Sequence, residues 1–155
     1  MTAALLDVNV LVALFDPAHP NHEEAHRWFG ANRKRKWATC PITINGCVRV
    51  LSNPAYPSVS ATPAEVISRL QTLCSSPYHE AWPDEVSLLD ATLFRHSSVG
   101  GHQKITDVFL LGLAVRKGGR LISFDHSVSL KAVVGGEPRH LQILGAPAER
   151  PGSQA

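Results

Sequence analysis

The stretch Leu5-Leu6-Asp7-Val8-Asn9-Val10-Leu11 decides the fold of this chain of 155 residues, because it joins two apolar runs through one acidic residue. The run Ala3–Asp7 predicts a buried strand, and Val8–Phe15 predicts a short helix that stops at Asp16-Pro17. Asp7 therefore lies at a strand–helix junction. A carboxylate between two apolar runs is buried and needs a partner.

The same alternation of short strands and helices continues along the chain. Further strands are predicted at Trp37–Cys40, His79–Trp82, Arg120–Phe124 and, as an edge strand, His140–Leu144. Helices are predicted from Asn21 to Gly30, from Ile44 to Ser52, from Thr62 to Cys74, from Ser87 to His96, and over Val108–Lys117, which Thr106-Asp107 opens and Gly118-Gly119 closes. This order predicts an α/β sandwich around a mostly parallel sheet.

Composition limits the class of protein. A hydrophobic fraction of 44% with 18% charged residues is typical of one globular domain, and a net charge of +2 permits nucleic-acid binding without indicating it. Cys40, Cys47 and Cys74 form no C-x-x-C pair, which favours free thiols in a reducing cytosol. The N-terminus is a poor signal peptide and no apolar stretch reaches the length of a bilayer span, so we expect a cytoplasmic protein without membrane contact.

Three aspartates occupy positions of one kind. Asp7 and Asp125 each end a predicted strand, and Asp107 opens the late helix. Residues at the carboxyl ends of parallel strands converge, and clustered carboxylates need a cation, for which oxygen ligands favour Mg²⁺ or Mn²⁺ over zinc. Such a cation supports phosphodiester hydrolysis. Taken singly, Asp107 also suits a helix N-terminus and Asp125 the start of a turn.

Four segments in order resemble one known family. They are Leu5–Leu11, Arg49-Val50-Leu51-Ser52-Asn53-Pro54, Thr106-Asp107-Val108-Phe109-Leu110-Leu111 and Ser123-Phe124-Asp125. Together they resemble PIN-domain ribonucleases of the VapC type, which are toxins of toxin–antitoxin pairs, over about residues 3 to 145. The resemblance implies a PIN-like α/β/α sandwich, with residues 1–146 as a single domain and 147–155 as a loose C-terminal tail.

The resemblance also implies an activity. The chain would be a Mg²⁺- or Mn²⁺-dependent endoribonuclease that cuts a transfer or ribosomal RNA, is inhibited by a cognate antitoxin and forms a homodimer. Asp7, Asp107 and Asp125 would be the catalytic, metal-binding acids, with Asn9, Arg49 and Thr106 in support. Arg49 would pair with the rim of the acidic pocket or contact the antitoxin; a solvated helix charge is the other interpretation.

One position departs from the family pattern. The family has a glutamate five residues before the arginine, and this chain has Ile44 there. Isoleucine cannot bind a cation, and it fits an apolar stripe with Cys47, Val48 and Leu51; Asn45 is rotated by about 100° around the helix. An alternative function follows: a catalytically weak or inactive PIN-fold module that binds RNA or antitoxin.

Other signals are secondary. The run Arg33, Lys34, Arg35, Lys36 is a candidate contact for RNA phosphates or a solvated loop. His22 and His26 have metal-ligand spacing near His19, but no accompanying acid or cysteine motif, so we expect exposed histidines. His102, before Asp107, approaches the pocket or is merely solvated. Asn9 stands where a dehalogenase-like phosphatase needs a second acid, which argues against that class. The chain also lacks the acidic pair of a receiver domain and the G-x-G-x-x-G motif of a nucleotide-binding fold.

Overall fold

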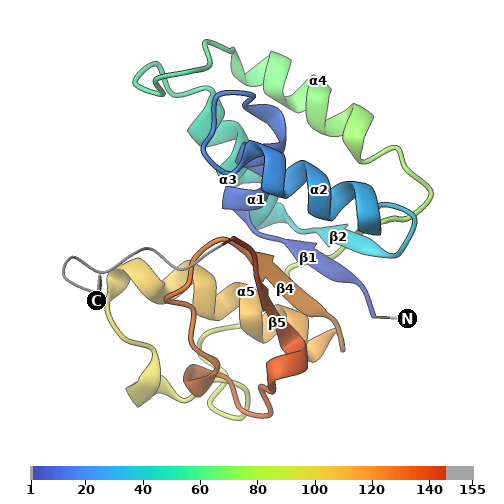
Figure 1. Ribbon diagram of the computed structural model, residues 1–155. Coiled ribbons are helices and arrows are strands. Elements are labelled where there is room, and N and C mark those ends of the chain that lie inside the picture. Colours follow the sequence, from blue (N-terminus) through green and yellow to red (C-terminus); the bar gives the residue numbers. More distant parts are fainter. Residues whose placement is uncertain (1, 146–155) are drawn as a thin grey trace, which may run out of the picture.

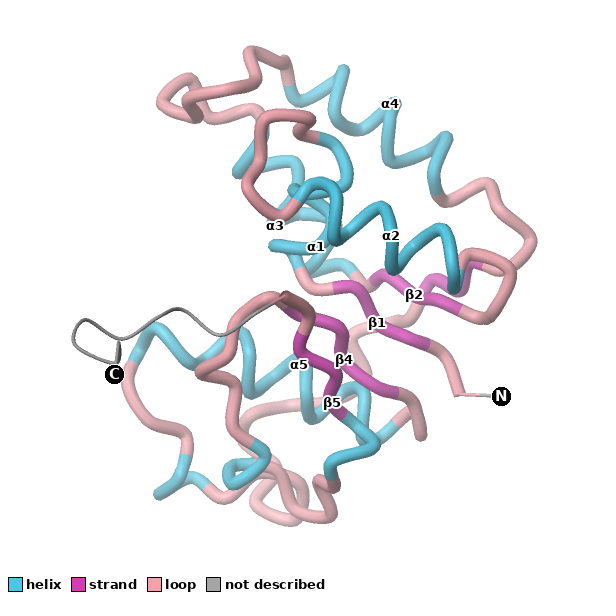
Figure 2. Tube along the Cα trace, in the orientation of Figure 1, coloured by secondary structure: helices cyan, strands magenta, loops and turns pink. Residues whose placement is uncertain are grey.

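A five-stranded parallel sheet forms the centre of this computed structural model, within residues 2–145, the part of the chain that the structure describes. Its strands are β1 (Ala4–Leu6), β2 (Trp37–Thr39), β3 (His79–Ala81), β4 (Arg120–Ser123) and β5 (Leu141–Ile143). They lie in the order β3-β2-β1-β4-β5, and every pairing is parallel. Figure 2 shows β2, β1, β4 and β5 as magenta segments at the centre of the molecule. All five predicted strands are confirmed, including the edge strand. The predicted tail, 147–155, lies outside the described residues.

Helices cover both faces of the sheet (Figure 1). One face carries α1 (Val8–Phe15), α2 (His22–Asn32), α3 (Pro41–Leu51) and α4 (Pro63–Leu73), and the other carries α5 (Ile105–Arg116). Successive strand residues point to opposite faces, so Leu6 packs with α1 while Leu5 packs with α5. The predicted α/β/α sandwich is confirmed. No helix in the described range is long and apolar enough to span a membrane.

Helix starts follow local capping chemistry. The Thr62 hydroxyl accepts the Glu65 N–H at 3.2 Å, which completes the predicted capping box of α4. Helix α3 begins at Pro41, earlier than the predicted Ile44, because Pro41 suits a first turn and Thr43 Oγ1 accepts the Cys40 N–H. Asn21 makes no side-chain cap to α2, which continues past Gly30 to Asn32.

The prediction of a helix over Ser87–His96 is wrong. The segment forms turns, in which Asp90 Oδ1 accepts both the N–H and the hydroxyl of Thr92, and Phe94 makes an isolated antiparallel bridge with Val133. Leu89 is 89% exposed, so the apolar residues of this segment do not form one buried helical stripe. Side-chain hydrogen bonds and packing of Phe94 override the helical spacing here.

Short 3₁₀ helices complete the fold, at His96–Ser98, His102–Lys104, Leu130–Ala132 and Pro138–His140. The second of them leads directly into α5, so Thr106 and Asp107 lie within the first turn of that helix. After the end of α5, Gly118 has a φ of 67°, the left-handed conformation that glycine supplies after a helix. The chain then enters β4.

Candidate active site

Asp7 is held at the carboxyl end of β1 as the N-cap of α1. Its Oδ1 accepts the Val8 N–H at 2.7 Å, and its Oδ2 accepts the hydroxyl of Ser123, at the end of β4, at 2.8 Å. The side chain is only 4% exposed, and burial raises its pKa above the usual value although both hydrogen bonds lower it. The predicted buried acid therefore has its partners.

Ser123 organises this site, a role that the sequence analysis did not assign to it although Ser123-Phe124-Asp125 is one of the segments that resemble the family. Besides donating to Asp7, its Oγ accepts the side-chain amide of Asn9 at 3.1 Å and the N–H of Asp125 at 3.0 Å. Asn9 Oδ1 in turn accepts the Phe124 N–H at 3.1 Å. Asn9 thus ties α1 to the end of β4.

Asp107 and Asp125 form the rest of the acidic cluster. Burial, the charge of Asp7, and the hydrogen bond and charge of Asp125 raise the pKa of Asp107 to about 7. The pKa of Asp125 lies below its usual range, chiefly because the Ser127 hydroxyl and N–H bond its Oδ1 at 2.5 and 2.9 Å. Lys104 lowers the pKa of both acids and donates to Ser127. The structure therefore brings the three predicted acids together.

The donor chemistry of this cluster fits a hard divalent cation. Three carboxylates meet with mutual repulsion, and the oxygens of Asp7 each accept one protein hydrogen bond and have a second acceptor site. In residues 2–145 no three or more Asp, Glu, His or Cys side chains are placed so that together they could hold a metal ion. Mg²⁺ uses one or two carboxylates and retains waters, so the residues fit it without such a group.

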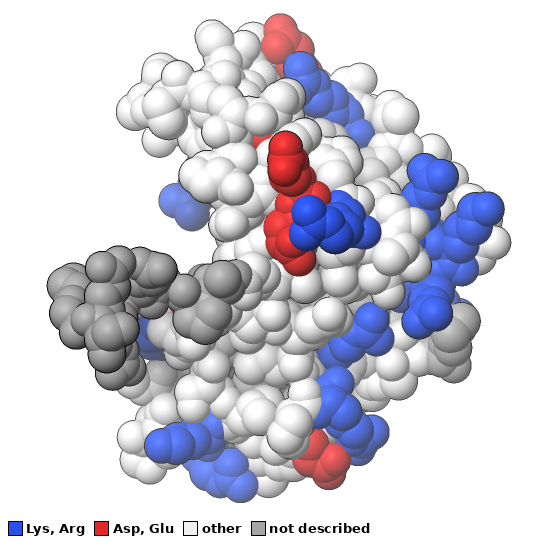
Figure 3. All heavy atoms as spheres, viewed as in Figure 1, with Lys and Arg blue, Asp and Glu red and all other residues white. Residues whose placement is uncertain are grey.

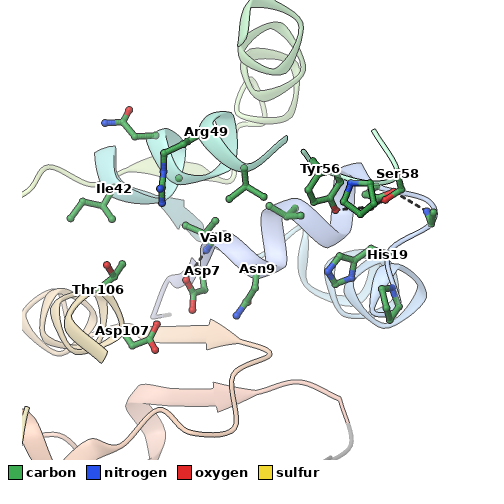
Figure 4. A pocket seen from close by; sticks show the side chains of 18 residues that line it. Asp7, Val8, Asn9, His19, Ile42, Arg49, Tyr56, Ser58, Thr106 and Asp107 are labelled. Carbon is green, nitrogen blue, oxygen red and sulfur yellow. Dashed lines mark hydrogen bonds between the residues drawn. The ribbon is translucent and has the colours of Figure 1, made fainter. Parts of the chain in front are cut away.

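A cleft of about 870 Å³ extends from this cluster between α1 and α3 (Figure 4). Asp7, Asp107 and Thr106 line one end, and Asp16, His19, Tyr56 and Ser58 line the other. Asp125 is not in its wall. The apolar side chains of Val8, Val12, Ile42 and Val50 also line it. The cleft thus joins an acidic end to a long, partly apolar wall.

Asp16 fastens the far end of the cleft. Its Oδ2 accepts the hydroxyls of Tyr56 at 2.6 Å and Ser58 at 2.7 Å, and its Oδ1 accepts the Ala18 N–H at 2.9 Å. Burial raises the pKa of Asp16, but these hydrogen bonds outweigh it and place the pKa below the usual value. Asp16 therefore holds the loop after α3 against the end of α1. The sequence analysis assigned it only the end of a helix.

Helix α3 forms one wall of the cleft, and Ile44 is not part of that wall. Ile42, Asn45, Gly46 and Arg49, spaced as one helical face, line the cleft. Ile44 lies on another side of α3 and packs with the cluster of Cys47, Val48 and Leu51, which confirms the apolar stripe. Asn45, one position further along the helix, lines the cleft, whereas Ile44 does not. The α3 wall carries no acid in this structure.

Of the other supporting candidates, Arg49 and Thr106 both reach the cleft. Arg49 is exposed, and none of the ion pairs between described residues includes it, so its predicted pairing with the acidic rim is not seen. Figure 4 shows it projecting from α3 on the opposite side of the cleft from Asp107. The basic run 33–36 does not line the cleft at all. It lies between α2 and β2.

The histidines have structural partners. His22 Nδ1 lies 2.7 Å from the Ala13 carbonyl and His26 Nε2 lies 2.8 Å from the Leu14 carbonyl, so both close the C-terminal end of α1. His26 is exposed as expected, whereas His22 is partly buried. His19 lines the cleft and accepts the Asn21 N–H, while His102 is exposed and does not line the cleft.

Comparison with known proteins defines the class. Residues 4–134 match the family model of the PIN domain, so the chain is a PIN-domain protein. Ribonuclease VapC44 of Mycobacterium tuberculosis is 45% identical over 141 residues, covering 91% of this chain and 99% of the relative. Ribonuclease VapC39 of the same organism is 44% identical over 132 residues, covering 85% and 95%. The chain therefore belongs to the VapC ribonuclease family.

A solved structure agrees at the level of the fold. The crystal structure of Mycobacterium tuberculosis VapC20, described as a sarcin-ricin loop cleaving toxin, superposes with a TM-score of 0.59 at 13% identity. The match covers 85% of this chain and 97% of that one. The PIN-like arrangement of sheet and helices is thus shared across sequences that have diverged widely.

Proposed function

We propose that this protein is a metal-dependent endoribonuclease toxin that hydrolyses RNA phosphodiester bonds and is inhibited by a cognate antitoxin. One observation carries the proposal: Asp7, Asp107 and Asp125 converge from β1, α5 and β4, and the first two line the acidic end of a cleft of about 870 Å³. Membership of a family whose relatives are named ribonucleases supports the reaction class.

The acids have distinct environments, and these suggest their roles. Asp7, Asp107 and Asp125 would hold Mg²⁺, or Mn²⁺ in its place, and the bound ion would lower the pKa of a water and neutralise charge on the phosphodiester. Ser123 fixes the Asp7 carboxylate, and Asn9 fixes the backbone after β4. Arg49, free of ion pairs with described residues and lining the cleft, would bind an RNA phosphate near the acids.

The shape of the cleft suits an extended ligand. An unpaired RNA segment fits a groove that has carboxylates at one end, Arg49 on one wall and apolar side chains along its length. A transfer or ribosomal RNA loop is the proposed substrate, in line with the RNA loop named for VapC20. The same apolar wall would receive the antitoxin segment that blocks the site, and the toxin would act as a homodimer in the cytoplasm.

The test is RNA cleavage by purified, antitoxin-free protein. Total transfer and ribosomal RNA are incubated in chelator, Mg²⁺ or Mn²⁺, with Asp107→Asn as the site variant and Asp84→Asn, on an exposed residue outside the cleft, as the matched control. Discrete products that require metal, persist in Asp84→Asn and fall at least about a hundredfold in Asp107→Asn are expected. Cleavage that survives both chelator and Asp107→Asn contradicts the proposal.

A second candidate function rests on the α3 wall. Because Ile42, Asn45 and Gly46 present no acid to the cleft, a weak or inactive module that binds RNA or antitoxin is the alternative. Asn45→Asp adds a carboxylate to the wall, and Ile44→Glu adds one on another side of the same helix. If the folded natural protein is silent and only Asn45→Asp cleaves RNA, the binding module is the correct function.

A further inference from the structure

A second, basic pocket lies at the amino ends of the strands. In the sheet, Ala4 of β1 pairs with Trp37 on one side and with Arg120 on the other, so Lys36, Ala4 and Arg120 lie nearly abreast. These residues enclose a pocket of about 270 Å³, which we call the amino-end pocket, lined by Thr2, Ala4, Asn32, Arg35, Lys36 and Arg120. Its lining includes no acidic residue.

The positive charges in this pocket are poorly compensated. Lys36 Nζ lies 3.6 Å from Glu80 Oε1, but neither Arg35 nor Arg120 is in an ion pair with another described residue. The Arg120 Nε donates to Gln142 Oε1 at 3.3 Å, which fixes the half-buried guanidinium in place. Burial and the charge of Arg35 lower the pKa of Arg120. Two guanidinium groups are therefore held close together without a carboxylate.

Figure 3 shows that Lys and Arg side chains gather on the side of the molecule next to the N-terminus, where β1 begins. Of the basic run in the sequence, Arg35 and Lys36 line the amino-end pocket, whereas Arg33 and Lys34 are exposed and do not. Arg120, more than 80 residues further along the chain, completes it. The sheet thus converts part of a linear charge run into a concave site.

The amino-end pocket and the acidic cleft lie at opposite ends of β1. Ala4 lines the first and Asp7 the second, and the two residues lie three steps, about 10 Å, apart along the chain. Leu5 and Leu6 between them are fully buried, so no ligand passes through the sheet. An RNA that contacts both sites must curve around the protein, which a folded RNA does and a short single strand does not.

We propose that the amino-end pocket binds a backbone phosphate of a folded RNA substrate at a point remote from the bond that is cut. Guanidinium groups match phosphate oxygens in bidentate geometry, and Lys36 adds a third cation. Phosphate contacts position RNA without reading its sequence, so the amino-end pocket selects for a folded shape while the cleft selects the segment to be cleaved. The proposal rests on the proposed RNA-cleaving function for its choice of ligand.

The experiment measures RNA affinity in chelator, separately from cleavage. Fluorescence anisotropy follows binding of labelled transfer RNA transcript and of a single-stranded octanucleotide by the full chain, as a function of salt. The variants are Arg35→Gln/Arg120→Gln and, because Arg120 also bonds Gln142 of β5, the single exposed change Arg35→Gln. Arg69→Gln/Arg139→Gln, two exposed arginines away from both sites, is a control with the same loss of charge.

We expect the double variant to bind transfer RNA about tenfold more weakly, and the slope of log affinity against log salt to fall by about 0.7–0.9, the value for one phosphate. Arg35→Gln alone gives a smaller loss in the same direction, and the control pair leaves the slope unchanged. The octanucleotide is expected to show no comparable loss. An equal loss of affinity in the control pair, or an unchanged salt slope in both pocket variants, overturns the proposal.

Two further probes separate other anions. If calorimetry detects pocket-dependent binding of inorganic phosphate while affinity for transfer RNA is unchanged in the variants, the amino-end pocket serves a small anion and the proposal is wrong. If the pocket variants bind polyglutamate more weakly but bind transfer RNA as well as the natural protein does, the amino-end pocket serves an acidic protein and the proposal is also wrong. If RNA affinity depends on the amino-end pocket but no metal-dependent cleavage occurs, this inference holds and the proposed function fails. If the protein cleaves RNA but its RNA affinity does not depend on the amino-end pocket, the proposed function holds and this inference fails.

Discussion

Replacing Ser123 by alanine removes one hydroxyl that three groups of the acidic site share. The hydroxyl donates to Asp7 Oδ2 at 2.8 Å and accepts from the Asn9 amide and the Asp125 N–H. Ser123 is fully buried and Asp7 is 4% exposed, so bulk water does not replace the lost donor. The substitution therefore leaves a buried carboxylate short of one hydrogen bond.

The expected cost follows from these contacts. A hydrogen bond to a charged group contributes about 1.5–3 kcal/mol, and the two donors that also lose their acceptor add about 1 kcal/mol because Asn9 and Asp125 are only partly buried. We expect the free energy of unfolding to fall by about 2–4 kcal/mol. Ser123 also lowers the pKa of Asp7, which burial raises, so its removal raises that pKa further.

The direction of the pH dependence can be worked out. Because the pKa of Asp7 is higher in the folded protein than in the unfolded chain, the folded state binds more protons, and stability falls as pH rises between the two values. Removal of the Ser123 hydroxyl raises the folded-state pKa of Asp7 and so extends to higher pH the range over which stability falls. The loss caused by Ser123→Ala should therefore be larger at pH 8 than at about pH 4, close to the unfolded pKa of an aspartate.

Urea unfolding in chelator at both pH values measures this effect. Ser75→Ala is the matched control, because the Ser75 hydroxyl donates to the Thr72 carbonyl at 2.7 Å but lies at an exposed position. A loss below about 0.5 kcal/mol for Ser123→Ala at pH 8, or the same loss at about pH 4 and at pH 8, refutes the reasoning, since neither result is compatible with a buried, hydrogen-bonded Asp7 carboxylate.

Three other predictions concern stability. Because the pKa of Asp107 is raised to about 7, the free energy of unfolding in chelator falls as pH rises from about 4 to 7. In urea titrations, Asp107→Asn should reduce this fall by about 1–2 kcal/mol, a value that allows for the partial exposure of the side chain. In thermal melts, Gly46→Ala should lower the Tm because its Cβ would lie 2.5 Å from a Val8 methyl, whereas Gly30→Ala in open space should raise it. Because the pKa of Asp16 is lower in the folded protein than in the unfolded chain, its carboxylate stabilises the fold above the unfolded pKa, and this stability is lost as pH falls through the folded value. In urea unfolding, Asp16→Asn should therefore cost about 1–3 kcal/mol at pH 7 and less at pH 2.

Most of the fold could be predicted from the sequence because short local motifs specify its elements. The Asp7 junction, the capping box at Thr62 and the glycine after α5 each specify an element through residues adjacent in sequence. Short strands that alternate with helices indicate a mostly parallel sheet with helices on its faces. The exception at Ser87–His96 arises because Phe94 pairs with Val133, a partner that local spacing does not reveal.

The site was readable only in part, because its geometry depends on contacts between distant residues. The aspartates share a position type that the sequence displays, but Ser123 is an ordinary strand serine until folding brings it to Asp7 and Asn9. The face that α3 turns to the cleft depends on the close approach of Gly46 to Val8. That contact was not predicted, so the sequence did not reveal that Asn45 lines the cleft, although the apolar stripe that includes Ile44 was predicted correctly.

The protein's own hydrogen bonds stabilise the acidic site without neutralising it. Each oxygen of Asp7 accepts one protein donor and has a second acceptor site, while burial, together with repulsion from Asp7 and Asp125, keeps the pKa of Asp107 near 7. A proton on Asp107 relieves that repulsion as a cation does, so the two compete for the same carboxylate. Because Ser123 and the capping N–H of Val8 fix the Asp7 carboxylate and Asn9 bonds Ser123, the fold would hold this proposed ligand in place before any ion arrives. The repulsion left among the carboxylates then favours cation binding over the ion-free state.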